Sequence, residues 1–238
     1  MREWLLSSNQ PDIEMYDNAD TMLHGNNSFQ QMYIFTHNDY QRFTELRPQI
    51  QARLEDFRQV PQEQYFYELC YCLCTPQSKA ENAHAVVSIL QKRDFERLGF
   101  DPMPVLRDKT HYVRFHETKA KRLLKARAEW QSIASILDSP REDEVKREWL
   151  VNNVDGMSWK EASHFLRNIG YTNLAILDRH TLKHLVRCGV FEAIPNIAGK
   201  ERYLAAGEAF QRFAVYVNIP MDELDLYFWA SEAGLVLK

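Results

Sequence analysis

The residues best suited to chemistry in this sequence are a lysine and an aspartate eighteen positions apart, Lys160 and Asp178. Ser158 and Glu161 have the spacing of a capping box, which predicts a helix that begins at Ser158 and carries Lys160 in its first turn. The positive end of the helix dipole disfavours an ammonium there and favours the neutral amine, which is a nucleophile. Asp178 follows an apolar run and is predicted to cap the next helix, which would hold its carboxylate rigidly. The pair indicates amine chemistry assisted by a carboxylate, although a solvated lysine and a plain helix cap fit the same local pattern.

The segment that positions Lys160 is predicted to be a helical hairpin over residues 150–170. Its tight turn contains Gly156, which tolerates a positive φ, and Gly170 suits the position just beyond the second helix. The backbone N–H groups around Gly156 and Ser158 have no partner within a helix, so they can bind a DNA phosphate.

Charge is distributed unevenly along the chain. The formal net charge is -4, which argues against binding of nucleic acid over the whole surface. Between Arg107 and Arg127, however, eight basic residues stand against two acidic ones. This stretch predicts a local basic surface, and a solvated helix face is the alternative.

Helical periodicity dominates from residue 65 onward and strand-type alternation is nearly absent, so the predicted fold class is all-α. The capping-box spacing of Ser78 and Glu81 predicts that a helix begins directly after the break at Pro76. Residues 1–44 show no sustained period and are predicted to be an N-terminal extension of unknown role. Further helices are expected through the basic stretch to Ser139, over 142–151, from Asp178 to Gly189, over 200–217 and over 221–232.

The composition indicates a compact protein without a membrane or secretion signal. The 238 residues are 45% hydrophobic, which suffices for one large domain or two small lobes. There is no apolar run of about 18 residues, and polar residues interrupt the N-terminus too early for a secretory signal, so we expect a cytoplasmic protein. Neither a P-loop nor a dinucleotide-binding glycine pattern occurs. The cysteines lack the spacing of a zinc site, so we predict buried thiols and no disulfide, metal or other cofactor: Cys70, Cys72, Cys74 and Cys188.

Three sequence blocks together resemble one known family. They are YFYELCYCLCTPQSKA, GMSWKEASHFLRNIGYTNLAILDRH, which contains the hairpin, and ELDLYFWASEAGLVLK at the end. Residues 65–238 are similar to the helix-hairpin-helix DNA glycosylase superfamily, and in particular to the microbial N-glycosylase/DNA lyase branch that removes 8-oxoguanine. The chain departs from the superfamily at Ser158, where glycine is common, and it lacks the four-cysteine motif of the iron–sulfur branch.

The resemblance implies two helical lobes around a DNA-binding cleft. One lobe would span residues 62–172 and contain the hairpin, and the other would combine residues 45–61 with residues 173–238. The expected partner is double-stranded DNA with a damaged base, bound through Gly156 and Ser158. The protein is expected to be a monomer that associates with the nucleoid and not with a membrane.

The same resemblance assigns the chemistry to Lys160 and Asp178. The amine would attack C1′ of the sugar and expel the base, while Asp178 would stabilise the cationic sugar and assist proton transfer. A Schiff base would follow, and β-elimination would cut the strand on the 3′ side. Because the target is out of reach inside the duplex, the nucleotide must be flipped out at a cost of about a few kcal/mol.

The resemblance also implies which residues surround the flipped base. The chain ends in Lys238, whose free carboxylate would accept a hydrogen bond from the N7–H that 8-oxoguanine has and guanine lacks. Trp229 and Phe115 would contact the base, and stacking on an aromatic ring is worth about 1–3 kcal/mol per base. Gln77 would fill the space left in the duplex. Taken alone, Lys238 fits a frayed tail, the two aromatics fit core residues, and Gln77 fits a polar residue at a helix start.

Two other functions remain open at this stage. A glycosylase with another damaged-base specificity would keep Lys160 and Asp178 but would not need Lys238. A helix-hairpin-helix module without chemistry would only bind DNA.

Overall fold

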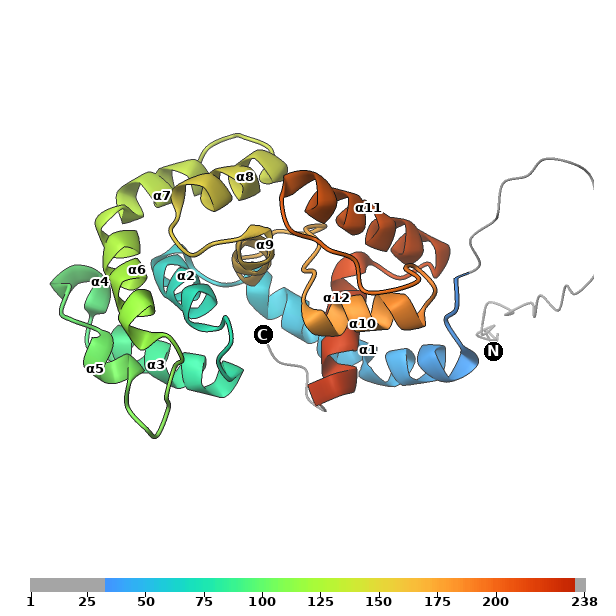
Figure 1. Ribbon diagram of the computed structural model, residues 1–238, viewed down its shortest axis with the longest axis horizontal. Coiled ribbons are helices and arrows are strands. Elements are labelled where there is room, and N and C mark those ends of the chain that lie inside the picture. The colour runs from blue at the N-terminus through green and yellow to red at the C-terminus, as the bar shows by residue number, and fades with distance from the viewer. Residues whose placement is uncertain (1–32, 234–238) are drawn as a thin grey trace, which may run out of the picture. The chain divides into compact units, whose positions relative to one another are not determined.

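Helices make up the regular structure of the computed structural model, which describes residues 33–233 (Figure 1). No strand occurs within this range, so the all-α prediction is confirmed. In chain order the helices are α1 (His37–Arg58), the 3₁₀ helix η1 (Gln62–Gln64), α2 (Tyr65–Cys74), α3 (Ala80–Lys92), α4 (Phe95–Leu98), α5 (Met103–Leu106), α6 (His116–Ala128), α7 (Trp130–Leu137), α8 (Asp143–Asn153), α9 (Trp159–Asn168), α10 (Arg179–Arg187), α11 (Lys200–Tyr216) and α12 (Met221–Ala233).

Two hydrophobic cores organise these helices. The first is built by α2 to α8 with part of α9, and it includes the fully buried Phe66 and Leu150. The second is built by α1, α10, α11 and α12, and it includes the fully buried Ile50 and Phe210. The two cores support the proposed division into two helical lobes, whose limits stay a prediction.

Helix α9 contributes to both cores. Phe165 and Leu166 belong to the first core, whereas Trp159 at the start of the helix belongs to the second. The helix packs against α2, α8 and α1, and Figure 1 shows it near the middle of these elements. Lys160 is therefore carried by an element that is fixed from both sides.

Helices α8 and α9 form the predicted hairpin. Gly156 has φ 92° in the turn between them. The N–H of Ser158 donates to the carboxylate of Glu161 at 3.3 Å, which confirms the predicted capping box of α9. At the other end Gly170 has φ 95°, and the next N–H donates to the carbonyl of Leu166 at 3.0 Å.

Helix α1 begins at His37, within the stretch of residues 1–44 predicted to be an extension. Thr36 and Asp39 form a capping box, with the Asp39 N–H donating to the hydroxyl at 3.2 Å and the Thr36 N–H to the carboxylate at 2.9 Å. Phe43 is 4% exposed and packs edge-on against another ring of the second core. The sequence pattern does not reveal this helix, because its few buried residues are separated by many charged ones. The remaining part of the predicted extension, residues 1–32, lies outside the described residues.

The capping box predicted for Ser78 and Glu81 is wrong. Helix α3 begins at Ala80, and the hydroxyl of Ser78 makes no cap hydrogen bond to it. Instead the hydroxyl accepts from the backbone N–H of Arg114 at 3.0 Å and from the ammonium of Lys119 at 3.1 Å. The prediction from local spacing fails here because the hydroxyl accepts hydrogen bonds from residues that are distant in the sequence.

The other predicted helices are present, with one division. The long helix expected to reach Ser139 consists of α6 and α7, which meet at Glu129. Helix α10 follows Asp178, and the chain turns at Gly189 with φ 73°.

All four cysteine thiols are buried, as predicted. Burial raises the pKa of Cys74 to about 12 and that of Cys188 to about 11. These thiols belong to the two cores and are not reactive groups of an open site.

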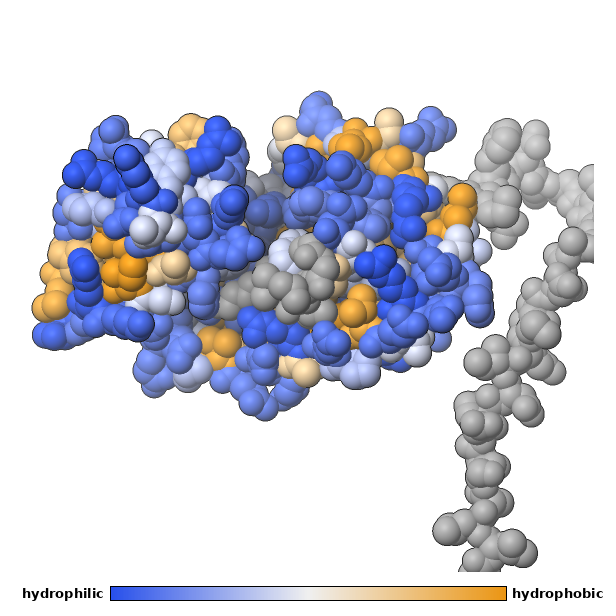
Figure 2. All heavy atoms as spheres, turned by 90° about the horizontal axis from the view of Figure 1, so that it is seen from below, coloured by the Kyte–Doolittle hydropathy of each residue, from blue (hydrophilic) through white to orange (hydrophobic). Residues whose placement is uncertain are grey.

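The face of the molecule shown in Figure 2 is mostly hydrophilic, with small separated hydrophobic areas. None of the helices in the described part of the chain is long and apolar enough to cross a membrane.

Candidate active site

A pocket of about 310 Å³ brings three of the predicted site residues together. Lys160 from α9, Asp178 from the start of α10 and Trp229 from α12 all line it. The loop after α2 and the first turn of α3 complete the wall, so elements of both hydrophobic cores contribute. An amine, a carboxylate and an aromatic ring are thus gathered from three separate parts of the sequence.

The side chain of Lys160 is 25% exposed and lies at the second position of α9. Its Nζ is 3.2 Å from Oε1 of Glu161. Burial disfavours the charged form of Glu161, but the Lys160 ammonium and the Ser158 hydroxyl hold its pKa below the usual range. The capping residue therefore stays ionised beside the amine and fixes the first turn of the helix.

Asp178 is the N-cap residue of α10. Its Oδ1 accepts from the backbone N–H groups of His180 and Thr181, both at 2.8 Å. The other oxygen, Oδ2, takes no part in the cap. Capping therefore fixes the carboxylate and leaves one oxygen for a second role in the pocket.

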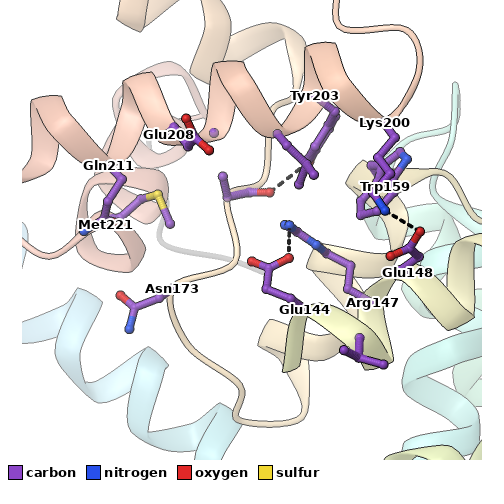
Figure 3. Close-up of a pocket in the computed structure, with 14 residues that line it drawn as sticks. Glu144, Arg147, Glu148, Trp159, Asn173, Lys200, Tyr203, Glu208, Gln211 and Met221 are labelled. Carbon is purple, nitrogen blue, oxygen red and sulfur yellow. Dashed lines mark hydrogen bonds and ion pairs between the residues drawn. The ribbon is translucent and has the colours of Figure 1, made fainter. Parts of the chain in front are cut away.

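Tyr203 of α11 holds the extended segment 174–177 that leads to Asp178. Its hydroxyl donates to the carbonyl of Ala175 at 2.8 Å, as Figure 3 shows, and it accepts from the N–H of Leu177 at 3.2 Å. Burial raises the pKa of Tyr203 far above its usual value, so the hydroxyl keeps its proton for this bond. The position of Asp178 is thus set on one side by Tyr203 and on the other by its own helix.

A larger pocket of about 680 Å³ is lined by α8, α11 and the start of α9 (Figure 3). None of the predicted site residues in the described range lines it. Lys200 and Glu148 form an ion pair of 2.5 Å between α11 and α8. The guanidinium of Arg147 lies over the ring of Trp159 at 5.2 Å and donates to Ser163 at 3.2 Å. These contacts tie α8 to α9 and α11 and thereby hold the hairpin in place.

A buried ion pair, Arg167 and Asp225, also lines the smaller pocket and was missed by sequence reasoning. Nη1 of Arg167 lies 3.3 Å from Oδ2 of Asp225, and Thr181 donates to Oδ1 at 3.3 Å. Burial raises the pKa of Asp225 to about 7, and the opposing effect of Arg167 is smaller. Besides Asp178 and Glu81, the pocket therefore holds the carboxyl group of Asp225, whose pKa burial raises to about 7.

Helical spacing could have revealed these residues. Lys160, His164 and Arg167 follow the pattern i, i+4, i+7, so they share one face of α9. Asp225 and Trp229 are separated by four positions and share one face of α12. All five residues line the pocket.

Replacement of Asp225 by Asn is expected to change how stability depends on pH. The folded pKa of about 7 lies above the ordinary value of 3.8, so the folded protein binds this proton more tightly, and that stabilising contribution is lost as pH rises from about 4 to about 7. Asparagine does not titrate. When the pH is raised from about 5 to about 8, the free energy of unfolding of the variant minus that of the wild type should therefore increase by about 2–3 kcal/mol. Urea unfolding at both pH values measures this difference, with the exposed Glu192→Gln as control, and an equal difference at both pH values would contradict it.

Gln77 and Phe115 do not line this pocket. Gln77 is exposed and the side chain of Phe115 lies in an open loop, where the residue is 54% exposed. Lys238 lies outside the described residues. The roles expected for these three residues stay predictions.

The hairpin turn lies beside the basic stretch. A shallow pocket is lined by Gly156 together with Lys121 and Arg122 of α6. A side chain at Gly156 would meet Arg122, since an added Cβ would lie 2.5 Å from its Cδ. The structure therefore places cationic side chains next to backbone N–H groups of the turn, an arrangement suited to a phosphate.

Comparison with known proteins agrees with this geometry. The family model described as 8-oxoguanine DNA glycosylase matches residues 50–219. A relative from Fusobacterium nucleatum, named 8-oxoguanine DNA glycosylase/AP lyase, is 37% identical in an alignment of 206 residues that covers 82% of this chain and 94% of the relative. A relative of the same name from Methanocaldococcus jannaschii is 34% identical in an alignment of 200 residues that covers 82% of this chain and 94% of that protein.

A solved structure shows the same fold. The 8-oxoguanine glycosylase/lyase of Methanocaldococcus jannaschii, in complex with a 15mer DNA containing 8-oxoguanine, matches with a TM-score of 0.71 and 30% identity. The match covers 83% of this chain and 98% of that one. The helix-hairpin-helix resemblance seen in the sequence is thereby confirmed. The chain belongs to the 8-oxoguanine DNA glycosylase family.

Proposed function

We propose that this protein excises 8-oxoguanine from double-stranded DNA and then cleaves the strand, as a bifunctional DNA glycosylase/AP lyase. The observation that carries the proposal is the placement of Lys160, on the second helix of the hairpin, and Asp178, at the start of α10, in the wall of one pocket. The amine supplies a nucleophile for both steps, and the fixed carboxylate supplies charge stabilisation. The names of the relatives support the same substrate and the same pair of activities.

In the proposed reaction the ammonium of Lys160, which is paired with Glu161, first loses a proton, and the neutral amine then attacks C1′ of the flipped nucleotide. This proton balances the one that the departing base takes up. The bond from C1′ to the base breaks, and its electron pair leaves with the base, which is then protonated. Asp178 stabilises the positive charge that develops on the sugar and assists proton transfer. Opening of the sugar ring gives a Schiff base between Nζ and C1′. Loss of a proton from C2′ then expels the 3′ phosphate and cuts the strand.

Recognition of the base is assigned to Trp229 and to the C-terminal carboxylate of Lys238. Trp229 lines the pocket beside Asp225, where its ring can stack on a flipped base. A carboxylate accepts a hydrogen bond from the N7–H of 8-oxoguanine and repels the N7 lone pair of guanine.

DNA binding is assigned to the hairpin turn and its surroundings. Gly156 would donate its N–H group to a phosphate, and Ser158 would lie at the same site, where its N–H would have to exchange the capping bond to Glu161 for the phosphate. The cations of α6 would add sequence-independent attraction. Gln77 would fill the space that the flipped nucleotide leaves in the duplex, and Phe115 would contact the flipped base. The protein would act as a monomer, in the cytoplasm and at the nucleoid, where this substrate lies.

The proposed function is tested with the wild-type protein on matched duplexes that carry 8-oxoguanine, another oxidised base or guanine at one position. We expect base release and strand cleavage at 8-oxoguanine and neither at guanine. Preference for another damaged base would show a different specificity on the same fold. Binding of all duplexes without base release would show a DNA-binding module without chemistry.

Extension of the chain beyond Lys238 by a short Gly-Ser segment is expected to reduce 8-oxoguanine excision while cleavage at a preformed abasic site persists. The extension removes the free carboxylate from its place, and a hydrogen bond to a charged group is worth about 1.5–3 kcal/mol, which corresponds to roughly 10- to 100-fold in rate. Single-turnover assays on both substrates measure the two rates. The same segment added before Met1 is the control, and undiminished excision by the C-terminally extended protein would contradict the assignment.

A further inference from the structure

Lys119 of α6 is a buried lysine with three protein partners. The residue is 1% exposed. The ammonium donates to the carbonyls of Cys74 and Pro76, both at 2.7 Å, and to the hydroxyl of Ser78 at 3.1 Å. Because an ammonium has three donor hydrogens, these partners satisfy it fully. It also lies at the C-terminal end of α2, where a cation meets carbonyls that the helix leaves unbonded.

Lys119 joins two loops that we call the rim, residues 74–80 and residues 112–116. The first loop lines the candidate active-site pocket. The hydroxyl of Ser78 accepts from a backbone N–H of the second loop at 3.0 Å. The backbone N–H of Lys119 donates to the carbonyl of Phe115 at 2.9 Å. One residue therefore holds the first loop with its side chain and the second with its backbone.

The rim contains the two most unusual backbone conformations in the described part of the chain. Gln77 and Phe115 have φ of 56° and 57°, in the left-handed region that long and aromatic side chains rarely adopt. Such conformations persist only where the surrounding structure fixes them. The other non-glycine residues with positive φ are of types that tolerate this region: Asp94, Asn173 and Asn218.

Both strained residues present their side chains to solvent beside the pocket. Gln77 is exposed, and Phe115 is 54% exposed despite its apolar ring. Neither side chain fills a core, so core packing does not account for the two conformations. The bonds of Lys119 and Ser78 are among the contacts that fix both loops, together with a bond from the Asn82 side chain to the carbonyl of Tyr112 at 2.8 Å.

We propose that Lys119 is a positioning residue that keeps the rim rigid while the DNA duplex is opened. The inference rests on the proposed function, because a paired base reaches the pocket only after it leaves the stack. A rigid rim can hold Gln77 and Phe115 against the opened duplex. A flexible rim would instead be displaced when the base pair forms again. Lys119 itself does not line the pocket, and Lys160 and Asp178 lie on α9 and at the start of α10, outside the rim. Chemistry on a base that is already unpaired should therefore depend on Lys119 much less than duplex opening does.

The test compares one lesion in two settings. Wild type and Lys119→Met are assayed under single-turnover conditions on 8-oxoguanine paired with cytosine, and on 8-oxoguanine within an unpaired bubble. Methionine keeps the length of the side chain and removes all three donors. We expect excision from the paired duplex to fall at least about tenfold and excision from the bubble to change less than about threefold, since only the first requires duplex opening.

Two further variants serve as a second test and as a control. Ser78→Ala removes the link between the loops with a small change of volume. Because Ser78 also lines the pocket, the readout for this variant is the ratio of the two rates, which should shift in the same direction as for Lys119→Met and to a lesser degree. Lys92→Met removes an exposed lysine from α3 and should change neither rate. Thermal unfolding shows whether each variant is folded.

The inference would be overturned if the folded Ser78→Ala and Lys119→Met variants lost activity equally on the paired and the bubble substrate. It would also be overturned if the variants and the wild type excised the lesion at the same rate from each substrate. A 2-aminopurine placed beside the lesion reports opening of the duplex by its fluorescence, without any need for excision. If the wild type released no 8-oxoguanine, the proposed function would be wrong, and the 2-aminopurine signal would still show whether Lys119 supports opening.

Discussion

Substitution of Lys160 by Gln is expected to abolish the adduct that borohydride traps between the protein and DNA containing 8-oxoguanine. The adduct is a reduced Schiff base, which forms only if an amine of the protein is bonded to C1′. Because the same amine expels the base, base release should fall together with strand cleavage, by about 10³-fold or more. Denaturing gels of the trapped complex and of the cleaved strand measure both effects.

Lys79 provides a matched control for this experiment. It also lines the pocket, on the loop before α3, and it is exposed. Lys79→Gln removes the same charge from the same pocket and should leave the adduct in place. An adduct that persists in Lys160→Gln and disappears in Lys79→Gln would assign the nucleophile to Lys79 instead. Lys160 makes its one ion pair with Glu161, which caps α9, so its loss should leave the fold intact.

The local features of the candidate site could be predicted from the sequence. The hairpin turn, the capping box of α9 and the cap of α10 each involve residues within a few positions of one another, so their spacing alone specifies them. Lys160 and Asp178 were found in this way. That both line one pocket depends on tertiary packing, and the resemblance to a known family supplied that step.

The features that were missed are held by contacts between distant segments. Ser78 has the spacing of a capping residue, but the ammonium of Lys119 and a backbone N–H 36 positions away take its hydroxyl. Asp225 is paired with Arg167, 58 positions away, in a region whose pattern indicates only a helix. Helical spacing places each partner on the same face as a predicted site residue, but no spacing within either helix shows that the two partners meet.

The start of helix α1, residues 37–44, was missed for a related reason. Of these eight residues only Asp39 and Phe43 are buried, and Phe43 packs against the ring of Tyr227. The partner ring lies 184 positions later in the chain. A stripe of buried residues that depends on such a partner is too sparse to be recognised from local periodicity.

Replacement of Asp178 by Asn is expected to reduce base release by about 10²- to 10³-fold with little loss of stability. Asparagine and aspartate are equally good N-cap residues, so the hydrogen bonds to His180 and Thr181 can remain. The substitution removes the negative charge that would face the cationic sugar. It therefore separates the structural role of the residue from its electrostatic role.

Asp178→Ala supplies the complementary control, because alanine removes both the charge and the cap. This variant should lose about 1 kcal/mol of stability in addition to activity. Urea unfolding and single-turnover base release, measured on both variants, distinguish the two roles. If Asp178→Asn were fully active while Asp178→Ala were inactive and less stable, the residue would act only as a cap. Loss of activity in both variants, with loss of stability in Asp178→Ala alone, would show that the carboxylate acts on the reaction while its helix holds it in place.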